Sequence, residues 1–312
     1  METLAVVMQR PGEVALSRLG LPTLAAGELA VDVLWSGIST GTERLLWQGT
    51  MPHFPGMGYP LVPGYETVGR VCATAEGFEH RQGELVFVSG ARCFGDIRGL
   101  FGGAASRLVV PADKAHTIDE TLREHGILLA LAATARHALS VAREVPELIV
   151  GHGVLGRLLV RVMLAEGHPA PVVWETNAAR REGAIGYQVV DPADDARRDY
   201  QNICDVSGSI DALDALIGHS ARGAQVVLAG FYADRVSFAF PPAFMRELQF
   251  AIAAEWQPED LARVTQLAHE RRLSLAGLIT HSALPEAAND AYQTAFDDPS
   301  CLKMMLDWSH IA

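Results

Sequence analysis

The pattern of apolar and polar residues differs between the part of the chain up to about residue 120 and the part that follows. Up to about residue 120, short runs rich in Val and Leu alternate with Pro-Gly, Gly-Glu and Gly-Gly turns, a pattern typical of a β-rich domain. We expect strands over residues 4–8, 28–34, 67–72, 85–89 and 106–110. Between the second and third of these, residues 35–65 are dense in Gly, Pro, Met and aromatic side chains. So long a loop in a compact domain indicates a functional segment.

From about residue 121 the pattern changes to apolar strands that alternate with helical segments. Strands are expected over 148–150, 171–175, 188–191, 202–206, 224–229 and 248–253, and helices over 155–166, 178–185, 210–217 and 259–272. Continuous apolar strands separated by helices predict a parallel sheet that is covered on both faces. The remainder adds a strand over 277–280, a helix that begins near Pro285 and a strand over 303–307.

The most informative motif joins the first of these parallel strands to its helix. Gly151, Gly153 and Gly156 have the spacing G-x-G-x-x-G in a strand–turn–helix context, which predicts a dinucleotide site. Gly151 would permit the tight turn, Gly153 would let the backbone approach a pyrophosphate, and Gly156 would let helix and strand pack closely. The helix N-terminus, at Val154 and Leu155, would offer unpaired N–H groups to the phosphates. A glycine-rich turn without a nucleotide is the alternative.

The choice of cofactor depends on Glu175, which ends the next strand. An acid there accepts hydrogen bonds from the adenosine ribose and repels a 2′-phosphate, so NAD is favoured over NADP. Nearby Arg180 and Arg181 count against that choice, and Glu175 as an ordinary surface acid is an alternative. Two later strand ends carry small residues that would leave room for the cofactor, although the glycines could equally be turn formers. The small residues are Ser207, Gly208 and Gly230, and together with the adjacent Phe231 they are candidate cofactor-binding residues.

Composition excludes several classes of partner. A length of 312 residues favours two domains, and 49% hydrophobic residues suffice for proper cores. A net charge of −12 disfavours binding to nucleic acid or to an anionic membrane surface. No apolar run reaches the roughly 20 residues of a membrane span, and the first residues lack the features of a signal peptide. The four cysteines lack metal-binding spacing. We therefore expect a cytoplasmic protein with reduced thiols.

Several motifs come in the order found in the medium-chain dehydrogenase/reductase superfamily. They are GYE at 64–66, FGGAA at 101–105, TARHAL at 134–139, the glycine motif, and ITH at 279–281. More narrowly, SGISTGTE at 36–43 and MPHFPGMGYP at 51–60 resemble the 3-hydroxyethyl bacteriochlorophyllide a dehydrogenase family.

This resemblance implies an α/β protein of two domains. Residues 1–120, completed by 275–312, would form a GroES-like β-barrel catalytic domain, and residues 121–274 a Rossmann domain with a doubly wound parallel sheet. The active site would lie between the two domains, Thr134 would belong to the cofactor site, and a homodimer is possible. The implied reaction is the NAD-dependent oxidation of the C3 1-hydroxyethyl group of a tetrapyrrole, a chlorophyllide or bacteriochlorophyllide, to an acetyl group.

Related alcohol dehydrogenases hold a catalytic zinc ion at positions that correspond here to Ser39, Tyr65 and Ala130. None of these is a good zinc ligand, so no metal is expected. A zinc site rebuilt from Glu43, His53 and Glu66 is the alternative.

Without zinc, the hydroxyl proton of the substrate needs another route. The candidate catalytic residues are Ser39, Thr40, Tyr65 and Glu66. Tyr65 would hydrogen-bond the substrate oxygen, Ser39 would pass the proton toward solvent, and Glu66 would brace the site rather than act as a base. Packing of Tyr65 in the loop is the alternative to its catalytic role.

A flat, apolar macrocycle needs a wide cleft lined by aromatic and Met side chains. The loop over 35–65 supplies Trp47, Met51, His53, Phe54 and Tyr59, although two or three apolar members of this loop would belong to the barrel core instead. His53 could approach the chlorin magnesium. Two other functions remain open: a zinc-free NADPH-dependent quinone or enoyl reductase, and a non-catalytic nucleotide- or pigment-binding protein.

Overall fold

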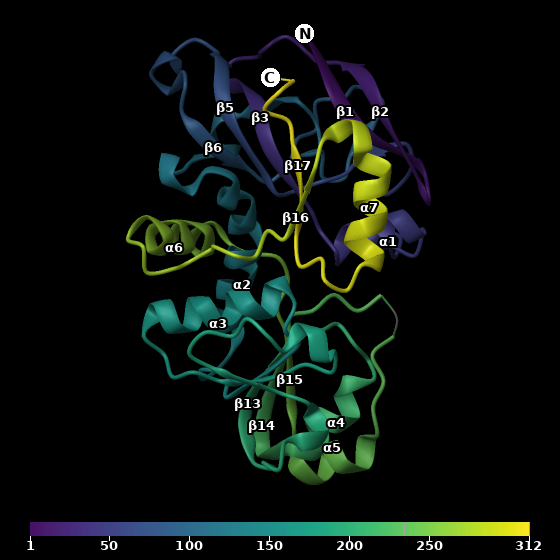
Figure 1. Ribbon diagram of the computed structural model, residues 1–312, viewed down its shortest axis with the longest axis vertical. Helices are drawn as coiled ribbons and strands as arrows, with labels where there is room; N and C mark the ends of the chain where they lie inside the picture. The colour runs from purple at the N-terminus through teal and green to yellow at the C-terminus, as the bar shows by residue number, and fades with distance from the viewer. Residues whose placement is uncertain (234, 312) are drawn as a thin grey trace. The chain divides into compact units, whose positions relative to one another are not determined.

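The computed structural model describes residues 1–233 and 235–311. The chain forms two compact units, which we call the first unit (residues 1–130 and 276–312) and the second unit (residues 131–275). Both ends of the chain lie in the first unit, where the yellow C-terminal strand runs beside the purple N-terminal strands (Figure 1). The second unit is therefore an insertion between two parts of the first.

The first unit is built from two sheets. One has the strand order β2-β1-β4-β7, and the other has the order β16-β17-β3-β5-β6-β9, with β8 also paired to β3. Their bounds are β1 Glu2–Arg10, β2 Glu13–Gly20, β3 Glu28–Ile38, β4 Leu61–Val62, β5 Thr67–Thr74, β6 Leu85–Val88, β7 Arg98–Gly99, β8 Arg107–Pro111, β9 Ala115–Thr117, β16 His281–Ala283 and β17 Met304–Asp307. Alternating side chains of β3 and β6 and the consecutive residues 5–8 of β1 belong to one continuous apolar core.

Short helices close this unit. They are α1 Thr42–Gln48, η1 Glu79–Arg81, η2 Ala112–Lys114, η3 Glu120–Leu128, η6 Pro285–Ala287 and α7 Ala288–Asp297. Helix α1 lies in the segment that the sequence pattern indicates as a loop, and α7 packs against β2 and β17. The strand expected over 277–280 is wrong, because that segment has no strand pairing and β16 begins at His281. The strand signal there came from two apolar residues, Leu278 and Ile279, that instead follow a glycine turn.

The second unit contains one six-stranded parallel sheet of order β12-β11-β10-β13-β14-β15. Its elements are α2 Leu129–Val141, β10 Leu148–Val150, α3 Val154–Glu166, β11 Val172–Trp174, η4 Ala178–Arg180, β12 Gln188–Val190, η5 Pro192–Asp194, β13 Tyr200–Asp205, α4 Ala212–His219, β14 Ser220–Leu228, α5 Phe240–Arg246, β15 Gln249–Ile252 and α6 Pro258–His269. From β10 the chain steps to β11 on one side, and from β13 it steps to β14 on the other. Right-handed crossovers then place α3 and α4 on opposite faces, and the order reverses between β10 and β13, where ligands of such sheets bind.

The helix expected over 178–185 is wrong. Only the single turn η4 forms there, and the chain continues as an irregular segment to β12. The cause is that buried side chains of the neighbouring glycine turn and of α3 take up backbone carbonyl groups of this segment, as described below.

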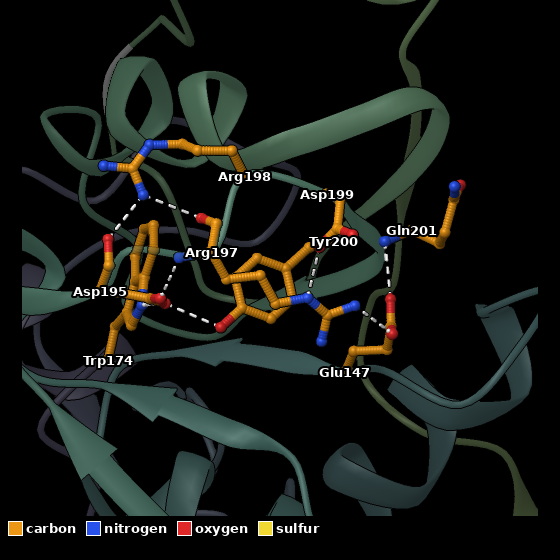
Figure 2. A network of polar contacts seen from close by, with 8 residues as sticks. All are labelled: Glu147, Trp174, Asp195, Arg197, Arg198, Asp199, Tyr200 and Gln201. Atoms are coloured by element: carbon orange, nitrogen blue, oxygen red, sulfur yellow. Dashed lines mark hydrogen bonds and ion pairs between the residues drawn. The ribbon is translucent and has the colours of Figure 1, made fainter.

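A polar network fixes the segment between β12 and β13 (Figure 2). Asp195 accepts hydrogen bonds from Trp174 Nε1 (2.8 Å) and from the Tyr200 hydroxyl (2.7 Å). The guanidinium group of Arg197 lies over the Tyr200 ring and pairs with Glu147 at the start of β10. These contacts hold the amino ends of β10 and β13 and connect them, through Asp195, to Trp174 at the end of β11.

Candidate active site

The glycine turn has a separate geometric reason for each of its glycines. Gly151 has φ +105°, and a Cβ there would lie 3.1 Å from the backbone of Ser207. A Cβ on Gly156 would lie 2.0 Å from the carbonyl oxygen of Gly151, so only glycine lets α3 approach the strand. A Cβ on Gly153 would meet no atom within 4 Å. Gly153 thus borders open space at the N-terminus of a 13-residue helix, which is a cradle for an anion.

Two further strand ends lie against this turn. A Cβ on Gly208 would lie 2.6 Å from Phe231 O, and one on Gly230 would lie 2.4 Å from the amide nitrogen of Gly208. The turns after β10, β13 and β14 therefore meet backbone to backbone, and the structure brings Ser207, Gly208, Gly230 and Phe231 together with Gly151. Close packing is itself a reason for glycine at 208 and 230, and Gly208 also has φ +65°, which is typical of a turn-forming glycine.

Asp205, at the end of β13, fixes this arrangement. Its buried carboxylate accepts hydrogen bonds from the backbone N–H and the hydroxyl of Ser207 (2.8 and 2.6 Å) and from the hydroxyl of Tyr232. Burial raises the pKa of Asp205, and the hydrogen bonds oppose that rise. The carboxyl group is thus a structural tie between two strand ends.

Glu175 follows β11 and faces the glycine turn. One carboxylate oxygen accepts the backbone N–H of His152 (3.1 Å), and the other accepts that of Asn177 (2.8 Å). Each oxygen retains acceptor capacity for a ribose hydroxyl. Val154 is buried and Leu155 half-buried in the first turn of α3, and Thr134 is half-buried in α2.

In the first unit, the ends of β3 and β4–β5 bring two hydroxyl groups together. Ser39 Oγ lies 2.6 Å from Tyr65 Oη, and the Ser39 side chain is buried. The Tyr65 ring is half-buried and meets the Phe101 ring edge-on, with 5.6 Å between centroids. Burial, with a contribution from the negative charge of Glu66, raises the pKa of the Tyr65 phenol. Tyr65 therefore keeps its proton at neutral pH. Thr40 adjoins this pair and is half-buried.

Glu66 is paired with a lysine that sequence reasoning missed. Both Glu66 oxygens lie within 2.8 Å of Lys303 Nζ, which also donates to Ile38 O, and neither side chain is exposed. Burial raises the pKa of Glu66, and the Lys303 ammonium opposes the rise. A Cβ on Gly37 would lie 2.1 Å from Glu66 Oε2, so the carboxylate lies directly over that glycine. This geometry is that of a brace, not of a base in contact with substrate.

A second buried carboxyl group, Glu43, lies in the same network. It accepts the backbone N–H of Ser39 (3.1 Å) and the hydroxyl of Tyr292 (2.7 Å). Burial is the largest cause that raises the pKa of Glu43 to about 7, and the charge of Glu66 adds to it. Of these two buried carboxyl groups, only Glu66 contacts the Lys303 ammonium group, whereas Glu43 is held by neutral donors. The only signals in sequence for Lys303 and Tyr292 are a lone lysine beside an apolar strand and an aromatic residue in an amphipathic helix.

The expected pocket side chains have mixed environments. Trp47 packs on Tyr292 and Phe296 of α7, with 6.0 and 6.1 Å between ring centroids. Tyr59 donates to the carbonyl of Leu46. Met51 and Phe54 are partly buried against the core, and His53 is exposed. Trp47 and Tyr59 are therefore engaged in packing of the first unit.

The donor set of this region is poor for zinc. The hydroxyl groups of Ser39 and Tyr65 hydrogen-bond each other, and the Glu66 carboxylate is ion-paired with the Lys303 ammonium group. None of these groups supplies the imidazole nitrogen or thiolate sulfur that zinc prefers. The alternative set of Glu43, Glu66 and His53 combines two buried carboxyl groups with an exposed imidazole. Across residues 1–233 and 235–311, no group of three or more His, Cys, Asp or Glu side chains is arranged to hold a metal ion. Over the same residues, no helix is both long and apolar enough to cross a membrane.

Comparison with known proteins gives a consistent picture. Residues 25–120 match the alcohol dehydrogenase GroES-like domain family. The chain is 55% identical over 310 residues to 2-desacetyl-2-hydroxyethyl bacteriochlorophyllide A dehydrogenase of Rhodobacter capsulatus, with 99% of each chain covered. It is 54% identical to the protein of the same name from Cereibacter sphaeroides, again with 99% of each covered.

Solved structures agree on the fold. A short chain alcohol dehydrogenase from E. coli CFT073, complexed with NADH, superposes with a TM-score of 0.81 at 20% identity, covering 98% of this chain and 99% of that one. The expected combination of a GroES-like domain and a Rossmann domain is therefore confirmed. The chain belongs to the family of the 2-desacetyl-2-hydroxyethyl bacteriochlorophyllide A dehydrogenases, within the medium-chain dehydrogenase/reductase superfamily.

Proposed function

We propose that this protein oxidises the 1-hydroxyethyl group of a bacteriochlorophyllide or chlorophyllide to an acetyl group in bacteriochlorophyll biosynthesis, with NAD as hydride acceptor and without zinc. The observation that carries the proposal is the Ser39–Tyr65 hydroxyl pair. It occurs in a chain that is 55% identical to the 2-desacetyl-2-hydroxyethyl bacteriochlorophyllide A dehydrogenase of Rhodobacter capsulatus. A secondary alcohol loses a hydride from carbon and a proton from oxygen. NAD supplies the acceptor for the hydride, so the chain's own residues must handle the proton.

Tyr65 and Ser39 are suited to that task. In this relay Tyr65 Oη accepts the proton of the alcohol as its own proton passes to Ser39 Oγ, and the Ser39 proton passes to solvent water. Because burial raises its pKa, the Tyr65 phenol is protonated before and after the step. Thr40 adjoins this relay, and Glu66 holds it in place through Lys303. The exposed part of the Phe101 ring, edge-on to Tyr65, offers an apolar surface for a macrocycle. Met51, His53 and Phe54 complete the pocket in this proposal.

NAD would be held by the glycine turn. The open space beside Gly153 and the N–H groups at Val154 and Leu155 fit a pyrophosphate, and Glu175 fits the adenosine ribose. Thr134 and the turns that carry Ser207, Gly208, Gly230 and Phe231 would complete the cofactor site. Glu175 disfavours a 2′-phosphate, which is the basis for NAD over NADP.

The test is turnover of purified protein with NAD and 3-hydroxyethyl bacteriochlorophyllide a after treatment with a metal chelator. We expect the absorbance change of acetyl formation, because the new carbonyl extends the conjugation of the ring. Tyr65→Phe should lower kcat by about 100-fold and leave the Kd for NADH unchanged, whereas Tyr200→Phe should retain kcat. Activity that is lost with the chelator and restored by zinc would refute the zinc-free mechanism. No turnover with any such pigment would refute the function.

We also propose a cytoplasmic homodimer. Strand β15 is an edge of the six-stranded sheet, and Ile252 on it is 76% exposed. Phe244 and Met245 of α5 are also exposed beside it and line an apolar groove with Phe250. An exposed apolar edge strand favours pairing with a second copy about a two-fold axis. Light scattering should give twice the monomer mass, and Ile252→Lys should give the monomer; a wild-type monomer would refute the dimer.

The proposed cytoplasmic location is supported by the four free thiols, which fit a reducing compartment.

A further inference from the structure

One residue of the glycine turn has a role that the motif itself does not require. His152 occupies the variable position between Gly151 and Gly153, yet its side chain is fully buried. Its backbone N–H donates to Glu175 Oε2 (3.1 Å), and its carbonyl oxygen accepts from Arg157 Nε (3.1 Å). Both ring nitrogens are also engaged. All four polar groups of this residue therefore make hydrogen bonds.

The ring of His152 bridges two points of the segment that follows Glu175. Nδ1 lies 2.6 Å from the carbonyl oxygen of Arg180, and Nε2 lies 2.6 Å from the hydroxyl of Tyr187. A carbonyl oxygen can only accept, so Nδ1 carries the proton and Nε2 accepts from Tyr187. Burial lowers the pKa of His152 to about 4, so the ring is neutral at physiological pH.

Arg157, on the first turns of α3, holds the same segment. Its guanidinium group donates to the carbonyl oxygens of Arg180 (2.9 Å) and Glu182 (2.7 Å). A Cβ on Gly183 would lie 2.7 Å from Arg157 Nη1, so the chain passes close against this group. These bonds take the place of a helix between β11 and β12. Residues 176–187 are thus fastened from outside by side chains of the glycine turn and of α3.

Both the glycine turn and residues 176–187 donate a hydrogen bond to the Glu175 carboxylate. The His152 N–H on one carboxylate oxygen belongs to the glycine turn, and the Asn177 N–H on the other belongs to the fastened segment. The direction of the carboxylate therefore depends on how the turn and the segment are held against each other. The Tyr187–His152–Arg180 contacts set that relation.

We propose that His152 and Tyr187 are positioning residues that aim Glu175 at the adenosine ribose and so set the preference for NAD over NADP. This inference rests on the proposed function. Without the Tyr187 hydroxyl, Nε2 of His152 is a buried acceptor without its donor. The segment keeps its bonds at Arg180 and Glu182 but loses its tie to the turn at residue 187, so that Glu175 is held less firmly in its direction. Binding of a ribose that bears two free hydroxyls weakens, while binding of a 2′-phosphorylated ribose, which gains nothing from Glu175, does not.

The experiment measures Kd for NADH and for NADPH by fluorescence titration of wild type and Tyr187→Phe. We expect the Kd for NADH to rise about fivefold to tenfold, with the Kd for NADPH unchanged, so that the preference falls by the same factor. His152→Leu should act in the same direction. His152→Gln, which retains a donor and an acceptor on the side chain, should recover part of the preference.

Tyr200→Phe is the matched control, because it also removes one hydrogen-bonded tyrosine hydroxyl from the second unit, at the amino end of β13. It should leave both Kd values unchanged. A Tyr187→Phe variant with an unaltered NADH to NADPH ratio, whether both Kd values stay or rise together, would overturn the inference and leave NAD binding intact. If wild type binds neither nucleotide, the proposed function fails and the inference fails with it.

Discussion

Replacing Glu43 by glutamine tests whether one buried carboxyl group controls the pH dependence of stability. The folded chain raises the pKa of Glu43 from 4.5 to about 7, chiefly through burial. A group whose folded pKa exceeds its unfolded pKa contributes stability that is complete below the unfolded value and is lost as pH rises through the folded value. Here the loss runs from pH 4.5 to about 7 and amounts to about 3 kcal/mol of unfolding free energy.

Glutamine imitates the protonated carboxyl group, since it offers one acceptor and one donor to the Ser39 N–H and the Tyr292 hydroxyl. We therefore expect the unfolding free energy of Glu43→Gln, relative to wild type, to improve by about 3 kcal/mol between pH 4.5 and about 8. Urea unfolding followed by tryptophan fluorescence at a series of pH values measures this difference. All other groups titrate in both proteins, so the difference isolates Glu43. Glu76→Gln, an exposed control in the same unit, should follow the wild-type profile. Parallel profiles for Glu43→Gln and wild type would refute the reasoning.

Three further substitutions probe the brace and the glycine turn. Lys303→Met leaves the Glu66 carboxylate buried without its partner and should cost about 3–5 kcal/mol in urea unfolding; adding Glu66→Gln should restore most of it, and a single variant as stable as wild type would contradict the brace. Gly151→Ala, at φ +105°, should lower the thermal stability of the second unit, with a cost above about 1 kcal/mol. Gly153→Ala should fold normally, since its Cβ meets open space, and should weaken NADH binding at least tenfold, or about 1.4 kcal/mol. Identical behaviour of the two glycine variants would show that their roles are not separate.

Local sequence patterns predicted the elements that depend on local physics. Strand β10, the glycine turn and α3 follow from an apolar run, three glycines and a helical period within about 20 residues, and the structure has all three. The helix over 178–185 failed for the opposite reason. The side chains of His152 and Arg157, which lie more than 20 positions before residue 178 in the sequence, bind carbonyl groups that a helix over 178–185 would use.

The polar centre of the first unit was only partly accessible from sequence. Ser39, Tyr65 and Glu66 were found because a known motif order marks them. Lys303 is 237 positions from Glu66, and Tyr292 is 249 positions from Glu43. No periodicity links such pairs, because the contacts depend on α7 and β17 returning to the first unit from the far side of the second unit in the sequence. Buried charge pairs of this kind become visible only through tertiary structure.

Gly37 lies against Glu66, and Glu66 is paired with Lys303, so these three residues must be changed together in laboratory evolution. Any side chain at 37 would occupy the volume of the Glu66 carboxylate, whose Oε2 lies 2.1 Å from where a Cβ would be. Smaller residues at 66 would open that volume but would strand the ammonium group of Lys303. Libraries that aim to reshape this part of the first unit should therefore randomise positions 37, 66 and 303 together, because a change at one position alone leaves either a steric clash or a buried charge without its partner.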